Sequence, residues 1–226
     1  MIKQVVHDWK TPLSSISTLA ELVERKSIAP EDEQGLKKIH LIQEEANRLK
    51  IGSQQLLKTL SGLAHLQINR SEFNLKDELL ALLEKQRLAN HGQKDLQLQL
   101  RYLVESETAY VSHFYLLGAI QNLLDNAVKY SGKAPHVTVI CYQKRGTLVI
   151  EVRDNGVGIP KKQQKHIFNK YYQVNKGEPA HGKKGYGLGL NYVYNVVKAH
   201  KGKITVNSTP GKGSTFTIYI SKWRKK

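Results

Sequence analysis

Two asparagines one helical turn apart, followed by two glycine segments, most constrain what this 226-residue chain can fold into. Asn122 and Asn126 lie four residues apart, so a helix places both amides on one face. An amide oxygen suits Mg²⁺, which takes few protein ligands and leaves its other positions to phosphate and water. The glycine segments at 154–158 and 185–189 let backbone N–H groups approach phosphate closely. In this order, these features predict a pocket for a Mg²⁺–nucleotide complex.

The same order resembles the catalytic core of sensor histidine kinases, within the wider family of kinases and ATPases that shares its ATP-binding fold. The resemblance runs from His7 to the segment 213–217 and rests on five boxes. They are the phosphoacceptor box at residues 6–13 and the N, G1, F and G2 boxes at residues 122–129, 154–158, 168–172 and 185–189. The resemblance implies ATP and Mg²⁺ as cofactors.

The resemblance also implies roles for individual residues of the nucleotide pocket. Asn126 matches the magnesium-chelating asparagine, and Asn122 is a second candidate ligand. Related ATPases carry at position 122 a glutamate that activates water; because an amide cannot accept a proton, transfer to a positioned acceptor is favoured over hydrolysis. Asp154 is expected to accept a hydrogen bond from the adenine amine. The other expected nucleotide-binding residues are Lys129, Tyr130, Gly156, Gly158, Phe168, Gly185, Gly187, Leu188, Gly189 and Thr215.

A phosphoacceptor histidine is predicted near the start of the chain. Imidazole acts as a nucleophile when one nitrogen keeps its lone pair and an acceptor holds the proton of the other. By resemblance, Asp8 holds the Nδ1 side of His7, and Nε2 attacks the γ-phosphoryl group. Thr11, one turn along, has in the family the role of orienting a water that removes phosphate from a partner. Pro12 fits either a helix start capped by Thr11 or a bend in a continuous helix, and the apolar residues before it favour the bend.

Residues 1–69 are predicted to form a helical hairpin that serves as the dimerisation and histidine phosphotransfer domain. Apolar side chains recur three or four residues apart over residues 2–26 and again over residues 32–67, with a proline-containing turn between them. A single hairpin of this length leaves a long apolar stripe uncovered, and two copies packed as an antiparallel four-helix bundle would cover it. We therefore expect a homodimer.

Residues 70–226 are predicted to form the catalytic ATP-binding domain. Alternating patterns predict strands, and Asn74 and Ser112 can cap helices. The expected strands lie at 96–100, 137–142, 148–152, 204–207 and 215–220, and the expected helices at 75–89, after residue 112 and from about 187 to 200. This mixture predicts one sheet with helices on one face, an α/β sandwich. The fold class of the whole chain is therefore α+β.

Composition narrows the remaining choices. The single cysteine, Cys141, excludes an internal disulfide, and its alternating apolar surroundings predict a buried structural thiol. No run of 18 apolar residues is present to span a membrane. The net charge of +16 is spread along the chain without a nucleic-acid motif, so we attribute it to solubility and to attraction for a triphosphate and an acidic partner. We expect no nucleic-acid partner.

These features together predict a sensor histidine kinase core. It would autophosphorylate His7 from ATP, in cis or in trans, and pass the phosphoryl group to an aspartate of a response-regulator receiver domain, with phosphatase activity toward that regulator as a second candidate activity. The helical pattern around His7 lacks earlier turns, so we expect sensor or membrane segments before residue 1. This chain would then be the cytoplasmic portion of a bacterial inner-membrane sensor and make no membrane contact itself.

Three alternatives compete with this interpretation. A hydrolysing ATPase of the same fold would carry an acid at position 122 and no histidine box. A pseudokinase that only binds nucleotide would have lost Asn126, Asp154 or the glycines, and none is lost. A basic nucleic-acid-binding protein would require the five boxes to arise by coincidence.

Overall fold

The computed structural model describes residue 42 and residues 68–90, 95–174 and 187–225. The chain divides into two units, residues 1–64 and 65–226, and nearly all described residues belong to the second unit. The helical hairpin predicted for residues 1–69, and with it the four-helix bundle, lies outside the described residues. The predicted domain boundary at residues 69 and 70 stays a prediction.

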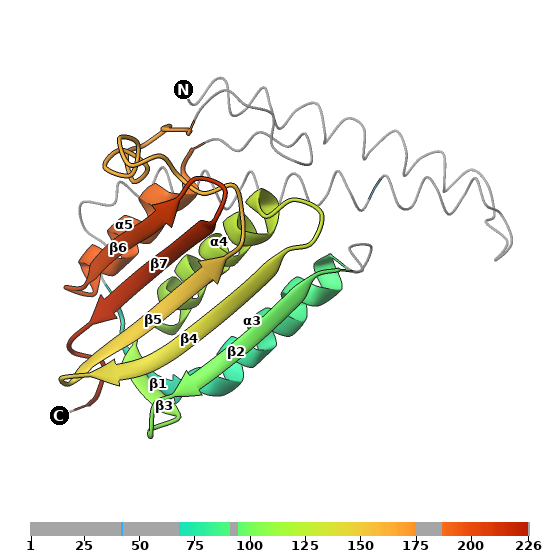
Figure 1. Ribbon diagram of the computed structural model, residues 1–226. Coiled ribbons are helices and arrows are strands. Elements are labelled where there is room, and N and C mark those ends of the chain that lie inside the picture. Colours follow the sequence, from blue (N-terminus) through green and yellow to red (C-terminus); the bar gives the residue numbers. More distant parts are fainter. Residues whose placement is uncertain (1–41, 43–67, 91–94, 175–186, 226) are drawn as a thin grey trace, which may run out of the picture. The chain divides into compact units, whose positions relative to one another are not determined.

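The described residues of the second unit form a five-stranded sheet, a two-stranded ribbon and three helices (Figure 1). The strands are β1 (Ser71–Asn74), β2 (Gln97–Leu103), β3 (Thr108–Val111), β4 (His136–Lys144), β5 (Thr147–Asp154), β6 (Lys203–Thr209) and β7 (Gly213–Ile220). The helices are α3 (Leu75–Ala89), α4 (His113–Tyr130) and α5 (Gly189–Ala199).

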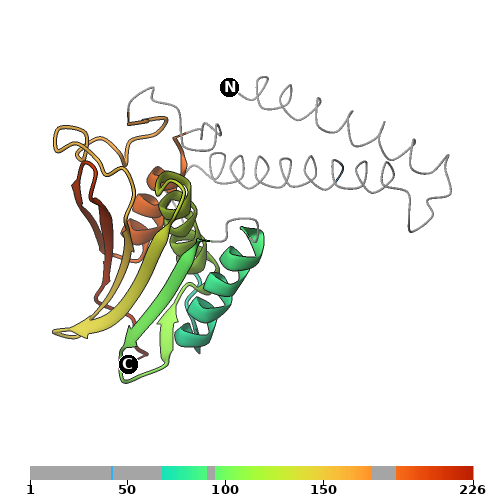
Figure 2. The same cartoon turned by 45° about the vertical axis from the view of Figure 1, so that its right-hand side comes forward.

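The large sheet is mixed and has the strand order β2-β4-β5-β7-β6. Strands β2 and β4 are parallel, and every other neighbouring pair is antiparallel. The ribbon pairs β1 with β3 in antiparallel fashion. All three helices lie on one side of the large sheet (Figure 2). This arrangement supports the predicted α+β domain with a single helical layer.

Local sequence explains where helix α3 begins but not where α4 begins. Asn74 caps α3 as predicted, because its side-chain oxygen accepts a hydrogen bond from the backbone N–H of Asp77 at 3.1 Å. Ser112 stands at the start of α4, but its side chain makes no capping bond. The backbone N–H of Ser112 donates instead to Nε2 of the buried His200, at the end of α5, at 3.1 Å.

The core lies between the sheet and the helices, where the inward faces of both meet. Leu148 and Ile150 of β5 and Ile218 of β7 pack there against the buried stripe of α4. The Cys141 thiol belongs to the same cluster, which confirms the predicted buried thiol, and burial raises its pKa to about 12. A thiol in this state is a packing group and a poor nucleophile.

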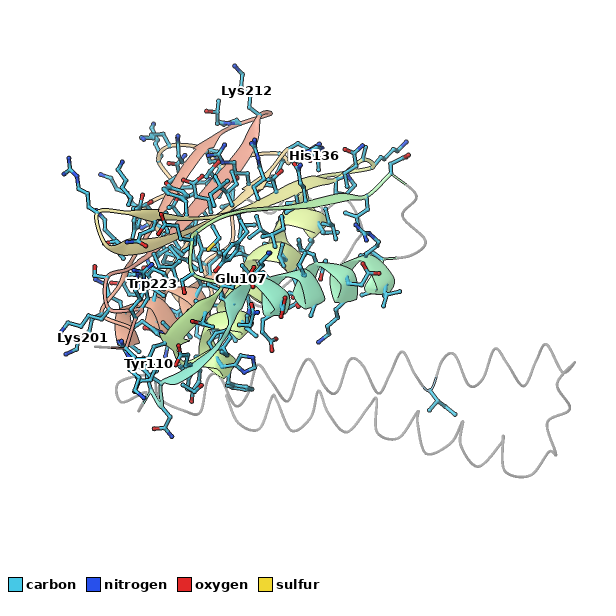
Figure 3. The ribbon with its side chains drawn as sticks, turned by 90° about the horizontal axis from the view of Figure 1, so that it is seen from below. Glu107, Tyr110, His136, Lys201, Lys212 and Trp223 are labelled. Atoms are coloured by element: carbon cyan, nitrogen blue, oxygen red, sulfur yellow. The ribbon has the colours of Figure 1, made fainter. Side chains whose placement is uncertain are left out.

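The end of the chain is part of the core, which the sequence patterns did not predict. Trp223, labelled in Figure 3 together with Tyr110, is only 1% exposed. Its indole N–H donates to the carbonyl of Gly146 at 3.1 Å. Its own carbonyl accepts from the N–H of Tyr110 in β3 at 2.6 Å. Trp223 therefore joins the small ribbon to the large sheet. No helix among the described residues is long and apolar enough to cross a bilayer.

Candidate functional site

Helix α4 carries four of the predicted nucleotide-site residues. Asn122 and Asn126 are both half-buried and lie one turn apart on the helix. The side-chain N–H of Asn122 donates to the carbonyl of Gly118 at 2.6 Å, which turns its oxygen away from its own helix. Lys129 and Tyr130 follow in the last turn, where the ammonium of Lys129 lies 5.1 Å from the centre of the Tyr130 ring. The amide oxygens and the lysine thus occupy the C-terminal half of one helix.

Asp154 ends strand β5 and is held by two backbone groups. The N–H groups of Gly156 and Ser214 donate to the same carboxylate oxygen, Oδ1, at 2.9 and 3.1 Å. Burial raises the pKa of this carboxyl above its usual range, and the two N–H donors oppose that rise. Because Oδ1 takes both backbone bonds, Oδ2 can accept a hydrogen bond from a ligand in a fixed direction.

Glycine is required in the G1 box because the loop lies directly on other backbone atoms. A Cβ at Gly156 would lie 2.5 Å from the carbonyl oxygen of Tyr130 at the end of α4. Gly158 has a positive φ of 67°, and a Cβ there would lie 2.1 Å from the carbonyl oxygen of Thr209. Between them, the N–H of Val157 donates to the Tyr130 carbonyl at 3.0 Å. The G1 loop therefore joins the helix of the N box to the β6–β7 turn.

The described part of the G2 box meets the N box at the start of α5. Leu188 precedes the first residue of the helix, Gly189, and a Cβ on Gly189 would lie 3.1 Å from Oδ1 of Asn122. Gly187 has a φ of 67° and its carbonyl accepts from the N–H of Tyr171 at 3.0 Å. The oxygen of Asn122 thus faces the N-terminus of α5, where backbone N–H groups favour anionic groups.

Phe168 of the F box supports α5 from the side. Its half-buried ring packs on the core and lies 6.0 Å from the ring of Tyr194, between centroids. Its carbonyl accepts from the side-chain N–H of Asn191 at 2.8 Å. The residues that follow Pro160 form consecutive turns. The contacts of Phe168 therefore position the helix behind the G2 box.

Some predicted site residues are not brought together. His7, Asp8, Thr11 and Gly185 lie outside the described residues. Thr215 pairs with Arg153, and side chains alternate along β7, so its side chain lies on the opposite face of the sheet from that of the buried Phe216. Its neighbour Ser214 is the residue beside Asp154. Residues two apart along a strand share a face. Counting from Phe216 would therefore have shown from the sequence that Ser214 lies on the same face as Phe216.

Two further supports of the G1 loop carry no recognisable sequence signal. The hydroxyl of Ser208 accepts from the N–H of Ile159 at 2.7 Å and donates to the carbonyl of Gly213 at 2.9 Å. The side-chain N–H of Gln164 donates to the carbonyls of Ile159 and Ser208, both at 2.8 Å. These bonds tie the end of the loop to the β6–β7 turn. Two of these bonds, from Ile159 to Ser208 and from Gln164 to Ser208, join residues more than 40 positions apart in the chain, so no local pattern reports them.

The site contains no dense set of metal ligands. Among the described residues there is no group of three or more His, Cys, Asp or Glu side chains that could hold a metal ion. A divalent cation at this site would be bound by the amide oxygens of α4 together with ligand phosphate and water, which is the coordination that Mg²⁺ accepts. The amide oxygens of Asn122 and Asn126 therefore fit the predicted Mg²⁺. The bound cation would neutralise phosphate charge.

Residues 115–224 match the family described as "Histidine kinase-, DNA gyrase B-, and HSP90-like ATPase". The matched residues include α4, the G1 loop, α5 and the strands β4 to β7. The site residues described above, from Asn122 to Ser214, thus lie within the matched range.

Related proteins extend the similarity to almost the whole chain. The sensor protein RprX of Bacteroides fragilis is 28% identical over 97% of this chain, and the adaptive-response sensory kinase SasA of Crocosphaera subtropica is 26% identical over 99%. The chain spans 42% and 59% of the lengths of these two relatives. One of these relatives is named as a sensor protein and the other as a sensory kinase.

Solved structures show the same fold at low identity. Full-length ShkA in complex with AMPPNP has a TM-score of 0.75 at 20% identity, over 99% of this chain and 46% of that chain. The histidine kinase ThkA in complex with the response regulator protein TrrA has a TM-score of 0.65 at 18% identity, over 98% of this chain and 61% of that one.

Proposed function

We propose that this chain is the catalytic core of a sensor histidine kinase that transfers the γ-phosphoryl group of ATP to His7. The observation that carries the proposal is the convergence of three elements. The amide of Asn122 faces the start of α5, the carboxylate of Asp154 is fixed by backbone N–H groups, and the G1 loop joins the two regions. Relatives named as sensory kinases support the same activity.

Asp154 is proposed to select adenine. Its Oδ2 accepts a hydrogen bond from the exocyclic amine of the base, while Gly156 and Ser214 hold Oδ1. Guanine carries a carbonyl oxygen at the matching position, and two acceptors facing each other leave the carboxylate without a partner. The buried environment of Asp154 makes that mismatch more costly than it would be in water.

Asn126 and Asn122 are proposed to contact the Mg²⁺–triphosphate end of the nucleotide. Asn126 is the expected cation ligand, and Asn122 is a second candidate. Lys129 adds a point charge for phosphate at the end of the same helix. The start of α5 contributes backbone N–H groups beside Asn122. Phosphoryl transfer needs mainly positioning and charge neutralisation, and these groups supply both.

An amide at position 122 favours transfer to an acceptor over hydrolysis. The nitrogen of Asn122 already donates to Gly118, and an amide oxygen has no useful basicity for accepting a proton from water. The acceptor proposed is Nε2 of His7, which attacks the γ-phosphorus as the bond to the bridging oxygen of ADP breaks. Asp8 would hold the proton on Nδ1 and stabilise the positive charge of the phosphorylated ring.

The phosphoryl group is proposed to pass from His7 to an aspartate of a response-regulator receiver domain. ThkA, a structural neighbour, has been solved in complex with a response regulator protein. The proposal includes a homodimer formed by the hairpin, with autophosphorylation in cis or in trans. It places this chain in the cytoplasmic part of a membrane-bound sensor.

The decisive experiment is incubation with γ-labelled ATP and Mg²⁺, followed by acid and base treatment of the labelled protein. Phosphohistidine is acid-labile and base-stable, so label that survives acid would overturn the proposed chemistry. His7→Gln should abolish labelling while leaving ATP affinity nearly unchanged, because the phosphoacceptor segment is separate in sequence from the nucleotide boxes. Persistent labelling of His7→Gln would remove His7 as the acceptor.

A mixture of two inactive variants distinguishes cis from trans transfer. His7→Gln keeps the nucleotide site, and Asp154→Asn keeps the acceptor histidine. After verified subunit exchange, label on His7 of the Asp154→Asn chain would demonstrate transfer in trans. No label would favour cis transfer.

A further inference from the structure

The face of the large sheet that points away from the helices carries a continuous row of side chains without an assigned role. Strand register aligns five residues across it, one from each strand: Leu103, Tyr142, Val149, Tyr219 and Lys203. The residues next to them in β5 and β7, Leu148 and Ile218, belong to the core beneath the helices. Because side chains alternate along a strand, the row lies on the open face.

The row is mainly apolar and aromatic. Leu103 is 67% exposed, and Tyr142 and Tyr219 are half-buried on either side of the buried Val149. The hydroxyl of Tyr142 donates to Oε1 of Glu151 at 2.9 Å, and the guanidinium of Arg153 donates to the other carboxylate oxygen. The negative charge of Glu151 is therefore compensated within the sheet, and the row itself presents no net negative charge.

Cations border this row at one end of the sheet. They come from the β4–β5 turn, the α5–β6 turn and the C-terminal segment, and all of them are exposed: Lys144, Arg145, Lys201, Lys203, Lys222, Arg224 and Lys225. No carboxylate occurs in residues 143–147, 200–203 or 221–226. The β4–β5 turn and the C-terminus lie at the same end of the domain in Figure 1, and Figure 3 shows Lys201 at the edge of the ribbon.

This basic end is too far from the nucleotide site to serve a triphosphate. Strand β5 runs from Thr147 at the basic end to Asp154 at the nucleotide site. Eight residues of strand span roughly 25 Å. Attraction for ATP therefore accounts for the lysines near the G1 loop but leaves the cations of this end unexplained.

We propose that the open-face row and its basic border dock on the surface of an anionic phospholipid bilayer. Lysine and arginine near such a surface each strengthen binding roughly fivefold. An exposed leucine can enter the acyl boundary, and tyrosine suits the interface because its ring is apolar and its hydroxyl polar. The ammonium of lysine is a point charge, which suits mobile lipid headgroups better than fixed ligands. The proposal departs from the sequence-based expectation that this chain makes no membrane contact.

A lipid surface explains the row better than a nucleic acid does. Single-stranded nucleic acid is bound by stacking bases on exposed aromatic rings. Among the apolar and aromatic members of this row, the most exposed is the aliphatic Leu103, and Trp223, at the basic end, is buried. The exposed Leu103 and the bordering cations also supply both requirements of interfacial binding, which are apolar area and positive charge.

Binding of the full chain to vesicles tests the proposal independently of kinase activity. Vesicles of phosphatidylcholine are compared with vesicles that also contain phosphatidylglycerol, by co-sedimentation. We expect binding to the anionic vesicles only, weakened by salt. Lys144→Gln/Arg145→Gln/Lys203→Gln should lower the partition coefficient by roughly a hundredfold, at about fivefold for each charge. Leu103→Gln should lower it without changing the net charge.

A matched control removes the same charge from the other end of the domain. Lys161→Gln/Lys162→Gln/Lys165→Gln changes three exposed lysines near the G1 loop and should retain most vesicle binding. Equal losses in the two triple variants would overturn the proposal, since net charge alone would then explain binding. Equal binding of the wild type to both kinds of vesicle would overturn it too. A third result would also overturn the proposal: the wild type binds a single-stranded oligonucleotide but no vesicles, and Lys144→Gln/Arg145→Gln/Lys203→Gln loses the oligonucleotide binding.

Discussion

The imidazole of His200 accepts a hydrogen bond from the backbone N–H of Ser112, with 3.1 Å between the two nitrogens. The other ring nitrogen, Nδ1, lies 2.8 Å from the carbonyl oxygen of Val196, so the proton of the neutral ring sits on Nδ1. This contact joins the end of α5 to the start of α4. The opposite ends of these two helices carry Gly189 and Asn126 of the nucleotide site. His200 thus sets the relative position of two helices on which the site depends.

Removing the His200 imidazole should destabilise the domain and flatten part of its pH dependence. His200→Leu leaves the buried N–H of Ser112 without an acceptor, at a cost of about 1–3 kcal/mol at neutral pH. Burial, together with the nearby charge of Arg70, holds the pKa of His200 below its usual range, although the Val196 carbonyl opposes this. The folded state therefore resists the proton that the unfolded chain accepts.

The sign of that pH dependence follows from the lowered pKa. As the pH falls below the ordinary histidine value of about 6.5, the unfolded state binds more protons, so the wild-type free energy of unfolding decreases. His200→Leu lacks this contribution, so the difference between the two proteins should narrow in acid. Urea unfolding of both proteins over a pH series measures it. If the difference in free energy of unfolding between the wild type and His200→Leu stayed constant with pH, the lowered pKa of His200 would be contradicted.

Asp154→Asn should separate stability from nucleotide binding. Burial raises the pKa of Asp154, so its carboxylate opposes folding at neutral pH, and the variant should be at least as stable as the wild type there. That advantage should disappear as the pH falls through the raised pKa, because the wild-type side chain then becomes neutral as well. ATP affinity should fall by roughly tenfold or more, about 1.4 kcal/mol. Urea unfolding and calorimetric titration measure the two effects, and unchanged affinity would remove Asp154 from base recognition.

Two glycines with similar backbone angles should respond differently to alanine. Gly158 and Gly211 have φ values of 67° and 75°, so either substitution carries a left-handed strain of about 1–2 kcal/mol. A Cβ at Gly158 would also lie 2.1 Å from the Thr209 carbonyl oxygen, whereas one at Gly211 meets nothing within 4 Å. Gly158→Ala should therefore displace the G1 loop and weaken ATP binding strongly. Gly211→Ala is the matched control, and equal losses of affinity would contradict the contact argument.

Thr11→Ala should spare labelling of His7 and slow dephosphorylation of the phosphorylated regulator. The hydroxyl is proposed to orient a water toward the acyl phosphate of the partner, and it has no part in attack on ATP. Phosphate release from purified phosphoregulator, with ADP present, measures the effect. Where the wild type clearly exceeds spontaneous decay, equal rates for both proteins would leave Thr11 with only a helix-capping role beside Pro12.

The sequence predicted those parts of the site where a residue type reports a local requirement. Gly156 and Gly158 are glycines because backbone atoms lie against them, and Asn74 caps α3 through a bond three residues away. Such requirements act within a few residues or demand one residue type, so they can be recognised from the amino-acid sequence alone. The helix from Leu75 to Ala89 was predicted with the bounds that the structure shows.

The missed features depend on contacts between distant segments. Trp223 stands between Lys222 and Arg224, so its neighbours in the sequence give no sign of its burial, whereas in the fold it joins the core and bonds to Tyr110 and Gly146. The β1–β3 ribbon was missed for the same reason, since each of its strands has only four residues. Thr215 was taken from a resemblance, and alternation along β7 places its side chain on the opposite face of the sheet from that of Phe216. Its contact with a nucleotide stays a prediction.

The contact between Arg70 and the carbonyl of Lys222 joins residues 152 positions apart, near the two ends of the second unit. Strand β7, which lies between β5 and β6, is the last strand of this sheet to be synthesised. During synthesis, the edge of β5 that pairs with β7 therefore stays unpaired until almost the entire unit has left the ribosome. Long-range pairing of this kind folds slowly. The proposed nucleotide site, whose Asp154 accepts a hydrogen bond from the N–H of Ser214 in β7, can therefore take shape only after β7 has been synthesised.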